Sequence, residues 1–218
     1  MMRDIAGGSE QPFETPNAPR KRQSRFMKCG LAALAVAVLA VSCSGSTQPI
    51  VKLGLIAPFE ELYRDDGYAV LHAVKLAISQ RNAAGGVAGR QVALVALNDN
   101  GRPDEAAMQS AQLGVDRDVL GVVGPLAEMT AAAAGPVLAA DGLPWLSLVD
   151  SEPGVFDPPP DFVTAYRSLA GGDPSPQALL AFDQTNRLLD AIERAGQSGS
   201  PSRETVRSAL AELGRVGQ

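Results

Sequence analysis

Histidine and cysteine, two common catalytic residue types, are scarce in this sequence, and the spacing of its polar side chains fits no common catalytic pattern. His72 is the only histidine, and the only cysteines, Cys29 and Cys43, lie near the N-terminus. A zinc site needs about four such ligands, so we interpret His72 as a buried or half-buried helix residue. The segment Gly-Gln-Ser-Gly-Ser at 196–200 lacks the last glycine of a hydrolase nucleophile elbow. The sequence therefore predicts no enzyme, no metal site and no cofactor.

The elements that must position the remaining polar side chains are alternating strands and helices. Apolar runs typical of strands buried on both faces occupy residues 50–57, 91–97, 119–123 and 144–148. Helical spacing of apolar residues, or favourable helix-start residues, mark the segments 68–82, 103–115 and 128–140. This alternation predicts an α/β fold, a doubly wound, mostly parallel open sheet with helices on both faces.

Polar corners follow all four predicted strands. In open parallel sheets, ligands bind beyond the carboxyl ends of the strands. The corners in question, several of them marked by glycine or proline, are residues 58–67, 98–102, 124–128 and 147–152. The sequence therefore places a candidate binding site where these four corners meet.

The N-terminal segment has the pattern of an export signal. Basic residues between Arg20 and Lys28 precede an apolar run at 30–41, which is followed by Ser42 and Cys43. The run is about a dozen residues long, whereas a membrane-spanning helix needs roughly 20. An uncleaved membrane anchor is the alternative, and Met27 is an alternative start of the chain.

The residues around Cys43 resemble the lipobox of bacterial lipoproteins, in which the cysteine carries the lipid. The segment 40–43 reads Ala-Val-Ser-Cys, and Leu39 stands one position farther from the cysteine than that motif prefers. The resemblance implies lipidation of Cys43 and a protein anchored to the bacterial membrane, facing the periplasm or the cell exterior. A chance cysteine is the alternative. Residues 44–49 are expected to form a flexible tether.

The charge balance argues against a nucleic-acid partner. The chain has 19 basic and 24 acidic residues, of which 6 and 3 precede Cys43, so the remainder has a net charge of −8. Binding to phosphates requires clustered cations, and the basic residues after Cys43 are dispersed. The length after Cys43 suits one domain with one core.

Several motifs resemble the leucine/isoleucine/valine-binding family, the type I periplasmic solute-binding proteins of ABC importers. The most specific is Asn-Ala-Ala-Gly-Gly-Val-Ala-Gly-Arg at 82–90, and the others are Asn98-Asp99 and Gly124-Pro125. The resemblance implies that the chain binds an amino acid and works with an ABC importer permease. Asp65-Asp66 are similar to the acidic corner of phosphorelay receiver domains, but the export signal and Gly124-Pro125 argue against that class.

The C-terminal part resembles the late helices of the same family, and the order of segments implies a missing lobe. Residues 162–167, 171–176 and 178–196 carry this resemblance. We expect a single α/β lobe at 50–218, made of strand and helix repeats at 50–150, a proline-rich junction at 151–161 and returning helices at 162–218. Residues 1–43 are assigned to an N-terminal extension and the lipoprotein signal. Members of the family close two lobes on the ligand, and this chain resembles the first lobe alone.

The resemblance also implies which residues meet a ligand. Position by position, the family's contacts after Gly-Pro and after the fourth strand fall on Glu128, Thr130, Asp150 and Ser151. Because Glu128 and Asp150 would repel a carboxylate, they suit an amine or a cation. Two plainer interpretations stay open. Glu128 and Thr130 favour the start of a helix, and acids at a disused site would keep it soluble.

The function implied is an exported, membrane-anchored solute-binding lipoprotein with weak or partner-dependent binding, since one lobe encloses a ligand poorly. A homodimer would complete the site. The alternatives are an interaction module without a small ligand, and a degenerate remnant that no longer binds one.

Overall fold

Four parallel strands form the sheet of this protein. The computed structural model describes residues 48–149 and 156–216. The strands are β1 (Ile50–Ala57), β2 (Gln91–Asn98), β3 (Val119–Val123) and β4 (Trp145–Leu146). They pair in the order β2-β1-β3-β4, and every pairing is parallel. The predicted parallel sheet is confirmed.

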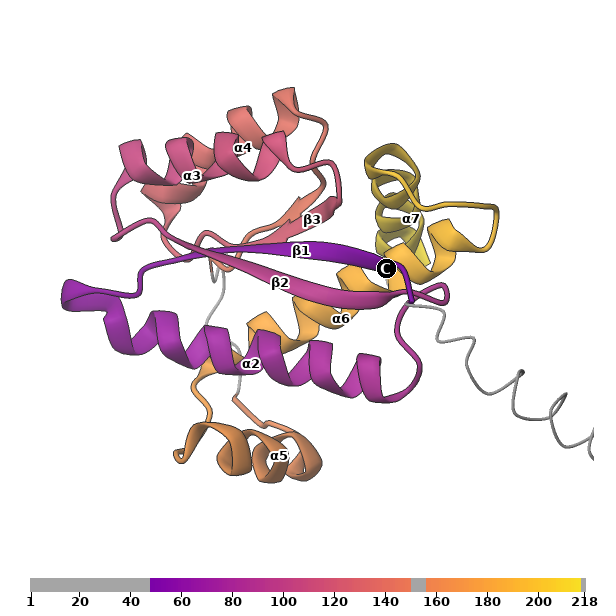
Figure 1. Ribbon diagram of the computed structural model, residues 1–218. Coiled ribbons are helices and arrows are strands. Elements are labelled where there is room, and N and C mark those ends of the chain that lie inside the picture. Colours follow the sequence, from indigo (N-terminus) through magenta and orange to yellow (C-terminus); the bar gives the residue numbers. More distant parts are fainter. Residues whose placement is uncertain (1–47, 150–155, 217–218) are drawn as a thin grey trace, which may run out of the picture. The chain divides into compact units, whose positions relative to one another are not determined.

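Helices cover both faces of this sheet, as predicted for a doubly wound fold. The helical elements are η1 (Glu61–Tyr63), α2 (Arg64–Ala83), α3 (Pro103–Val115), α4 (Glu128–Ala140), α5 (Pro160–Ala170), α6 (Pro176–Gly196) and α7 (Arg203–Val216). Helices α3 and α4 lie on one face, and α2 and α6 lie on the other (Figure 1). Helix α5 lies outside α2, and α7 packs on α6 and β3.

The central strands explain why the apolar runs are nearly continuous. Side chains of β1 alternate between faces, so Leu53 and Leu55 join the core against α2 and α6, while Ile56 joins the core against α3 and α4. All five residues of β3 are buried. A strand covered on both faces has no solvent side that requires polar residues.

The largest boundary differences from the sequence prediction concern α2, β4 and α5. Helix α2 begins at Arg64, four residues early, because Asp65 and Asp66 act as favourable acids in its first turn. Strand β4 has only two residues rather than the predicted five, since it forms an edge and pairs with β3 alone. Helix α5 begins at Pro160, inside the predicted junction, where a proline suits the first helical position.

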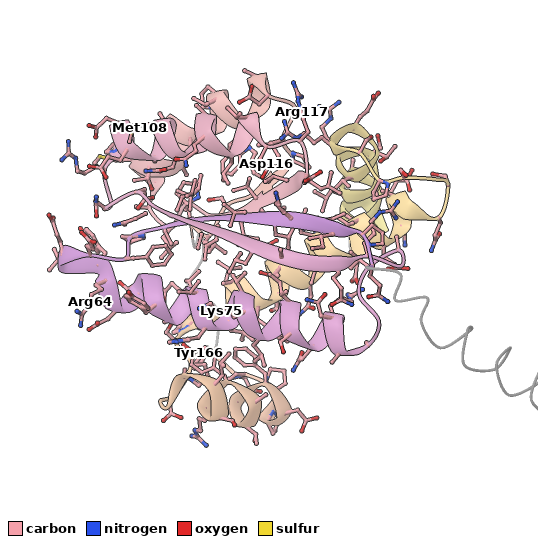
Figure 2. The ribbon with its side chains drawn as sticks, viewed as in Figure 1. Arg64, Lys75, Met108, Asp116, Arg117 and Tyr166 are labelled. Carbon is pink, nitrogen blue, oxygen red and sulfur yellow. The ribbon has the colours of Figure 1, made fainter. Side chains whose placement is uncertain are left out.

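Aromatic side chains join α5 to α2 and α6. Tyr166 of α5 lies against α2 (Figure 2), and its hydroxyl donates a hydrogen bond of 3.0 Å to the carbonyl of Ala69. The ring of Tyr166 meets His72 edge-on at 6.5 Å and Phe162 at 5.6 Å. His72 is half-buried and its pKa is lowered, first by burial and then by the nearby Lys75 ammonium. The prediction that His72 is a packing residue is confirmed.

A buried arginine ties α7 to the opposite helical layer. The guanidinium of Arg203 donates hydrogen bonds to the carbonyl oxygens of Gly114, Asp116, Val119 and Asp141, at distances between 2.6 and 3.2 Å. Three of these carbonyls lie at or just beyond the C-terminal ends of α3 and α4, where helix dipoles favour a cation. Asp116 lies at the end of α3, on the side of α7 (Figure 2). We refer to this arrangement as the Arg203 anchor.

Candidate functional site

A pocket of about 200 Å³ lies at the carboxyl ends of the strands. Because α2 follows β1 on one face of the sheet and α4 follows β3 on the other, the loops after these neighbouring strands diverge here. Such switch points are the usual ligand sites of open α/β sheets. Three of the four predicted corners supply its walls, and helices α4 and α6 supply the rest. The lining residues are Pro58, Tyr63, Asp66, Asp99, Gly101, Leu126, Ala127, Thr130 and Gln177. We call it the carboxyl-end pocket.

Side-chain amides hold the corners in place. The Oδ1 atom of Asn98 accepts hydrogen bonds from the backbone amides of Phe59, at 2.9 Å, and Asn100, at 3.0 Å. One asparagine at the end of β2 therefore joins the loop after β1 to the loop after β2. The Asn98-Asp99 motif, noted in the sequence for its family resemblance, thus has a structural role.

Close packing at Gly67 brings α2 against the first corner. A Cβ atom built on Gly67 would lie 1.6 Å from the carbonyl oxygen of Pro58. Only glycine permits this approach. It places Asp66, the residue before Gly67, on the pocket wall beside Pro58.

Asp99 is the buried acid of the pocket. Its side chain is fully buried, and its Oδ1 atom accepts a hydrogen bond of 2.9 Å from the amide of Gly101. Its Oδ2 atom has no hydrogen-bond partner among the described residues. Burial raises the pKa of the Asp99 carboxyl, and the Glu105 carboxylate raises it further, against the Gly101 hydrogen bond. A buried acceptor without a donor is costly, so a donor brought by a ligand would relieve it.

The opposite wall carries the starts of two helices. Ala127 is the N-cap of α4 and offers no side-chain acceptor, so the first backbone amides of α4 lack a cap. The hydroxyl of Thr130 donates to the carbonyl of Ala127 at 2.9 Å. Gln177, in the first turn of α6, is half-buried at the same wall. Free amides and helix dipoles at this wall favour an anionic group.

The pocket is therefore electrostatically two-sided. Asp66 and Asp99 supply carboxylates, and no lysine or arginine lies among its described lining residues. A molecule that carries an ammonium and a carboxylate a short distance apart matches this arrangement.

Of the four ligand contacts predicted from the sequence, the structure places only Thr130 among the described residues that line the pocket. Thr130 is buried at the pocket wall, with its hydroxyl already hydrogen-bonded. Glu128 is exposed at the start of α4 and does not line the pocket. Asp150, Ser151 and the proposed lipidation site Cys43 lie outside the described residues. Asp66 and Asp99 are not among the ligand contacts predicted from the sequence.

Two further observations concern only the described residues. No group of three or more histidine, cysteine or acidic side chains there is arranged to hold a metal ion. None of the helices described is long and apolar enough to cross a membrane.

The raised pKa of Asp99 predicts a pH-dependent stability. Because the folded state favours the protonated carboxyl, this group supports folding fully below its unfolded pKa of about 3.8. Its support is lost as the pH rises through the higher folded pKa. We expect Asp99→Asn to remove this part of the pH dependence, measured as unfolding free energy in urea between about pH 4 and pH 7. If the unfolding free energies of the wild type and of Asp99→Asn changed with pH in parallel, the pH dependence would not come from Asp99.

Comparisons with known proteins agree with this geometry. A family model described as periplasmic binding protein matches residues 50–160, half of the chain. No curated protein sequence matches the chain.

Solved structures show the same fold at low sequence identity. A putative branched-chain amino acid ABC transporter from Rhodospirillum rubrum has a TM-score of 0.66 and 17% identity, over 74% of this chain and 89% of that one. LivJ from Streptococcus pneumoniae, solved with isoleucine, has a TM-score of 0.66 and 14% identity, over 75% and 88%. The leucine-binding protein LivK from Thermotoga maritima has a TM-score of 0.63 and 15% identity, over 73% and 87%. These likenesses show the shared fold, and the family match over residues 50–160 shows that the chain belongs to the periplasmic binding protein family.

Proposed function

We propose that this protein is an exported solute-binding lipoprotein of an ABC importer and that it binds a small amino acid or amine in the carboxyl-end pocket. The observation that carries the proposal is the two-sided chemistry of that pocket. Asp66 and Asp99 suit an ammonium group, and the uncapped start of α4 suits a carboxylate. Family membership supports a binding role rather than catalysis.

We further propose that the chain is a single lobe and that it holds its ligand weakly. Its organisation is a signal and extension at 1–43, a tether at 44–49 and one lobe at 50–218, with lipidation at Cys43. The pocket is small and open to one side, and tight sites enclose most of the ligand. Glu128, Asp150 and Ser151 are proposed as outer contacts that would favour an amine. We expect dissociation constants of about 1 mM.

Exposed apolar side chains near the pocket favour a second candidate function, an interaction module or a homodimer. Leu62, next to the pocket residue Tyr63, is 83% exposed, and Met129, next to Thr130, is 68% exposed. Large exposed apolar side chains at one rim often mark protein interfaces. A second copy bound at this rim would supply the missing wall of the pocket.

Thermal unfolding of residues 44–218 with amino acids and polyamines tests the proposal. A ligand at ten times its dissociation constant adds about 1.4 kcal/mol to the stability. We expect Asp66→Asn to remove this ligand-induced gain, whereas Asp65→Asn keeps it, because Asp66 lines the pocket and Asp65 does not. The ligand-induced difference is compared because either substitution alone alters the first turn of α2.

Light scattering with and without the ligand separates the two candidates. A dimer that forms with the ligand supports a pocket completed by a second copy. A folded chain that no amine or amino acid stabilises would refute the binding function and favour the interaction module. A chain that does not fold would instead indicate a degenerate remnant.

A further inference from the structure

A second concave surface lies at the open edge of the sheet and shares no lining residue with the carboxyl-end pocket. Strand β4 pairs with β3 alone and ends the sheet. The end of α4, the residues around β4, and one side of α6 and α7 enclose a volume of about 390 Å³ beside it. We call this surface the edge pocket.

The floor of the edge pocket is apolar. Leu143, Trp145 and Leu146 line it from the sheet side, and Leu210 lines it from α7. Trp145 is half-buried, and its ring packs against Gly135 of α4, where a Cβ atom would lie 2.9 Å from the ring. The ring is therefore held in place while part of it remains available to a ligand.

Two arginines from different helices line the edge pocket beside these apolar residues. Arg187 projects from α6 and Arg207 from α7. Arg207, Leu210 and Gly214 share one face of α7, because they recur at helical spacing. The Nη2 atom of Arg187 lies 2.9 Å from the position that a Cβ atom on Gly214 would occupy, so this guanidinium reaches the same face.

These two cations lack an acidic partner. Neither Arg187 nor Arg207 forms an ion pair or hydrogen bond with any residue that the structure describes, and no acid lines the edge pocket in that part of the chain. Several arginines elsewhere show the contrast, since Arg81, Arg102 and Arg167 each form an ion pair with an aspartate. The residues after Cys43 have a net charge of −8, so acidic partners are available, yet these two cations beside an apolar surface have none among the described residues.

We propose that the edge pocket binds a small amphipathic carboxylate. The apolar body of the ligand lies on Trp145 and Leu210, and its carboxylate lies between Arg187 and Arg207. Planar guanidinium groups pair with carboxylates through two parallel hydrogen bonds, which an ammonium or a neutral amide cannot form. An apolar surface with a few polar groups that fix the orientation is the usual design of small-molecule sites.

The only tryptophan of the chain makes the proposal directly measurable. Trp145 lines the edge pocket, so its fluorescence reports occupancy there without a label. The probes are hexanoate, hexanamide and hexylammonium, which share one apolar body and differ in the charge of the head group. With the intact chain, we expect a saturable fluorescence change with hexanoate and none with hexylammonium. We expect Arg187→Gln combined with Arg207→Gln to weaken hexanoate binding about tenfold.

A matched control uses an exposed arginine elsewhere. Arg64→Gln, at the start of α2, removes one positive charge by the same substitution without touching the edge pocket and is expected to leave hexanoate binding unchanged. Equal responses to all three head groups would overturn the proposal, because apolar contact alone would then explain them. An unchanged fluorescence with hexanoate would also overturn it. So would hexanoate binding of wild-type strength by the protein with Arg187→Gln and Arg207→Gln, once circular dichroism has shown that it is folded.

Discussion

The Arg203→Met variant is expected to lose about 3–5 kcal/mol of unfolding free energy, a large part of the stability of a domain of this size. Methionine keeps much of the buried volume but removes every hydrogen bond of the Arg203 anchor. Each carbonyl left without a donor costs about 1–3 kcal/mol, and water that enters the vacated space offsets part of this. Burial lowers the pKa of the Arg203 guanidinium, but the group stays charged. Urea unfolding of residues 44–218 measures the loss.

Two further variants separate the anchor from a general charge effect. Arg203→Lys keeps the charge but cannot reach all four carbonyls with one ammonium, so it should lose an intermediate amount. Arg207→Met, one turn farther along α7, changes an exposed arginine and should stay within about 0.5 kcal/mol of the wild type. Equal losses at both positions would mean that the anchor has no special role.

The Gly67→Ala variant is expected to lose about 2–4 kcal/mol, although alanine is the better helix former. In an open helix this substitution gains about 1 kcal/mol. Here the added methyl would lie 1.6 Å from the Pro58 carbonyl oxygen, a backbone atom that cannot rotate away. Helix α2 must therefore move from the corner after β1. The same movement displaces Asp66 and Pro58, so ligand-induced stabilisation should fall as well.

Gly172→Ala is the control for this substitution. Nothing lies within 4 Å of a Cβ atom at Gly172, so the change in stability should be within about 0.5 kcal/mol. A Gly67→Ala protein as stable as the wild type would show that α2 does not approach Pro58 this closely.

Much of the fold could be predicted from local patterns because the local signals agree with the tertiary packing. The boundaries of β1, β3, α3 and α4 match the prediction. In α3, for example, Pro103 starts the helix and two acids follow it in the first turn. The predicted start of α2 was wrong because Arg64, Asp65 and Asp66 form a polar run that also suits a loop.

The candidate site was harder to predict, because burial there depends on residues distant in sequence. Asp99 follows a strand within a polar turn, and such a turn usually faces water. The pocket that Asp99 lines is also lined by Thr130 and Gln177, from helices that come much later in the chain. For Arg203, by contrast, the sequence does contain a local signal, because this basic residue stands in the first turn of a helix. A basic residue in the first turn of a helix is unfavourable for the dipole, which indicates that the guanidinium has acceptors elsewhere.

The Arg203 anchor has a consequence for the timing of folding. The residues that it joins are 62 to 89 positions apart in the sequence, and contacts of long sequence separation form slowly. During synthesis, β1 to β4 are complete before α6 and α7 exist to cover one face of the sheet. A ribosome-bound chain therefore cannot close the core on this face of the sheet until α6 and α7 have been made. For the exported protein that we propose, this order leaves one face of the sheet uncovered until α6 and α7 are present, which delays completion of the fold and favours passage of the chain through a secretion channel before the fold is complete.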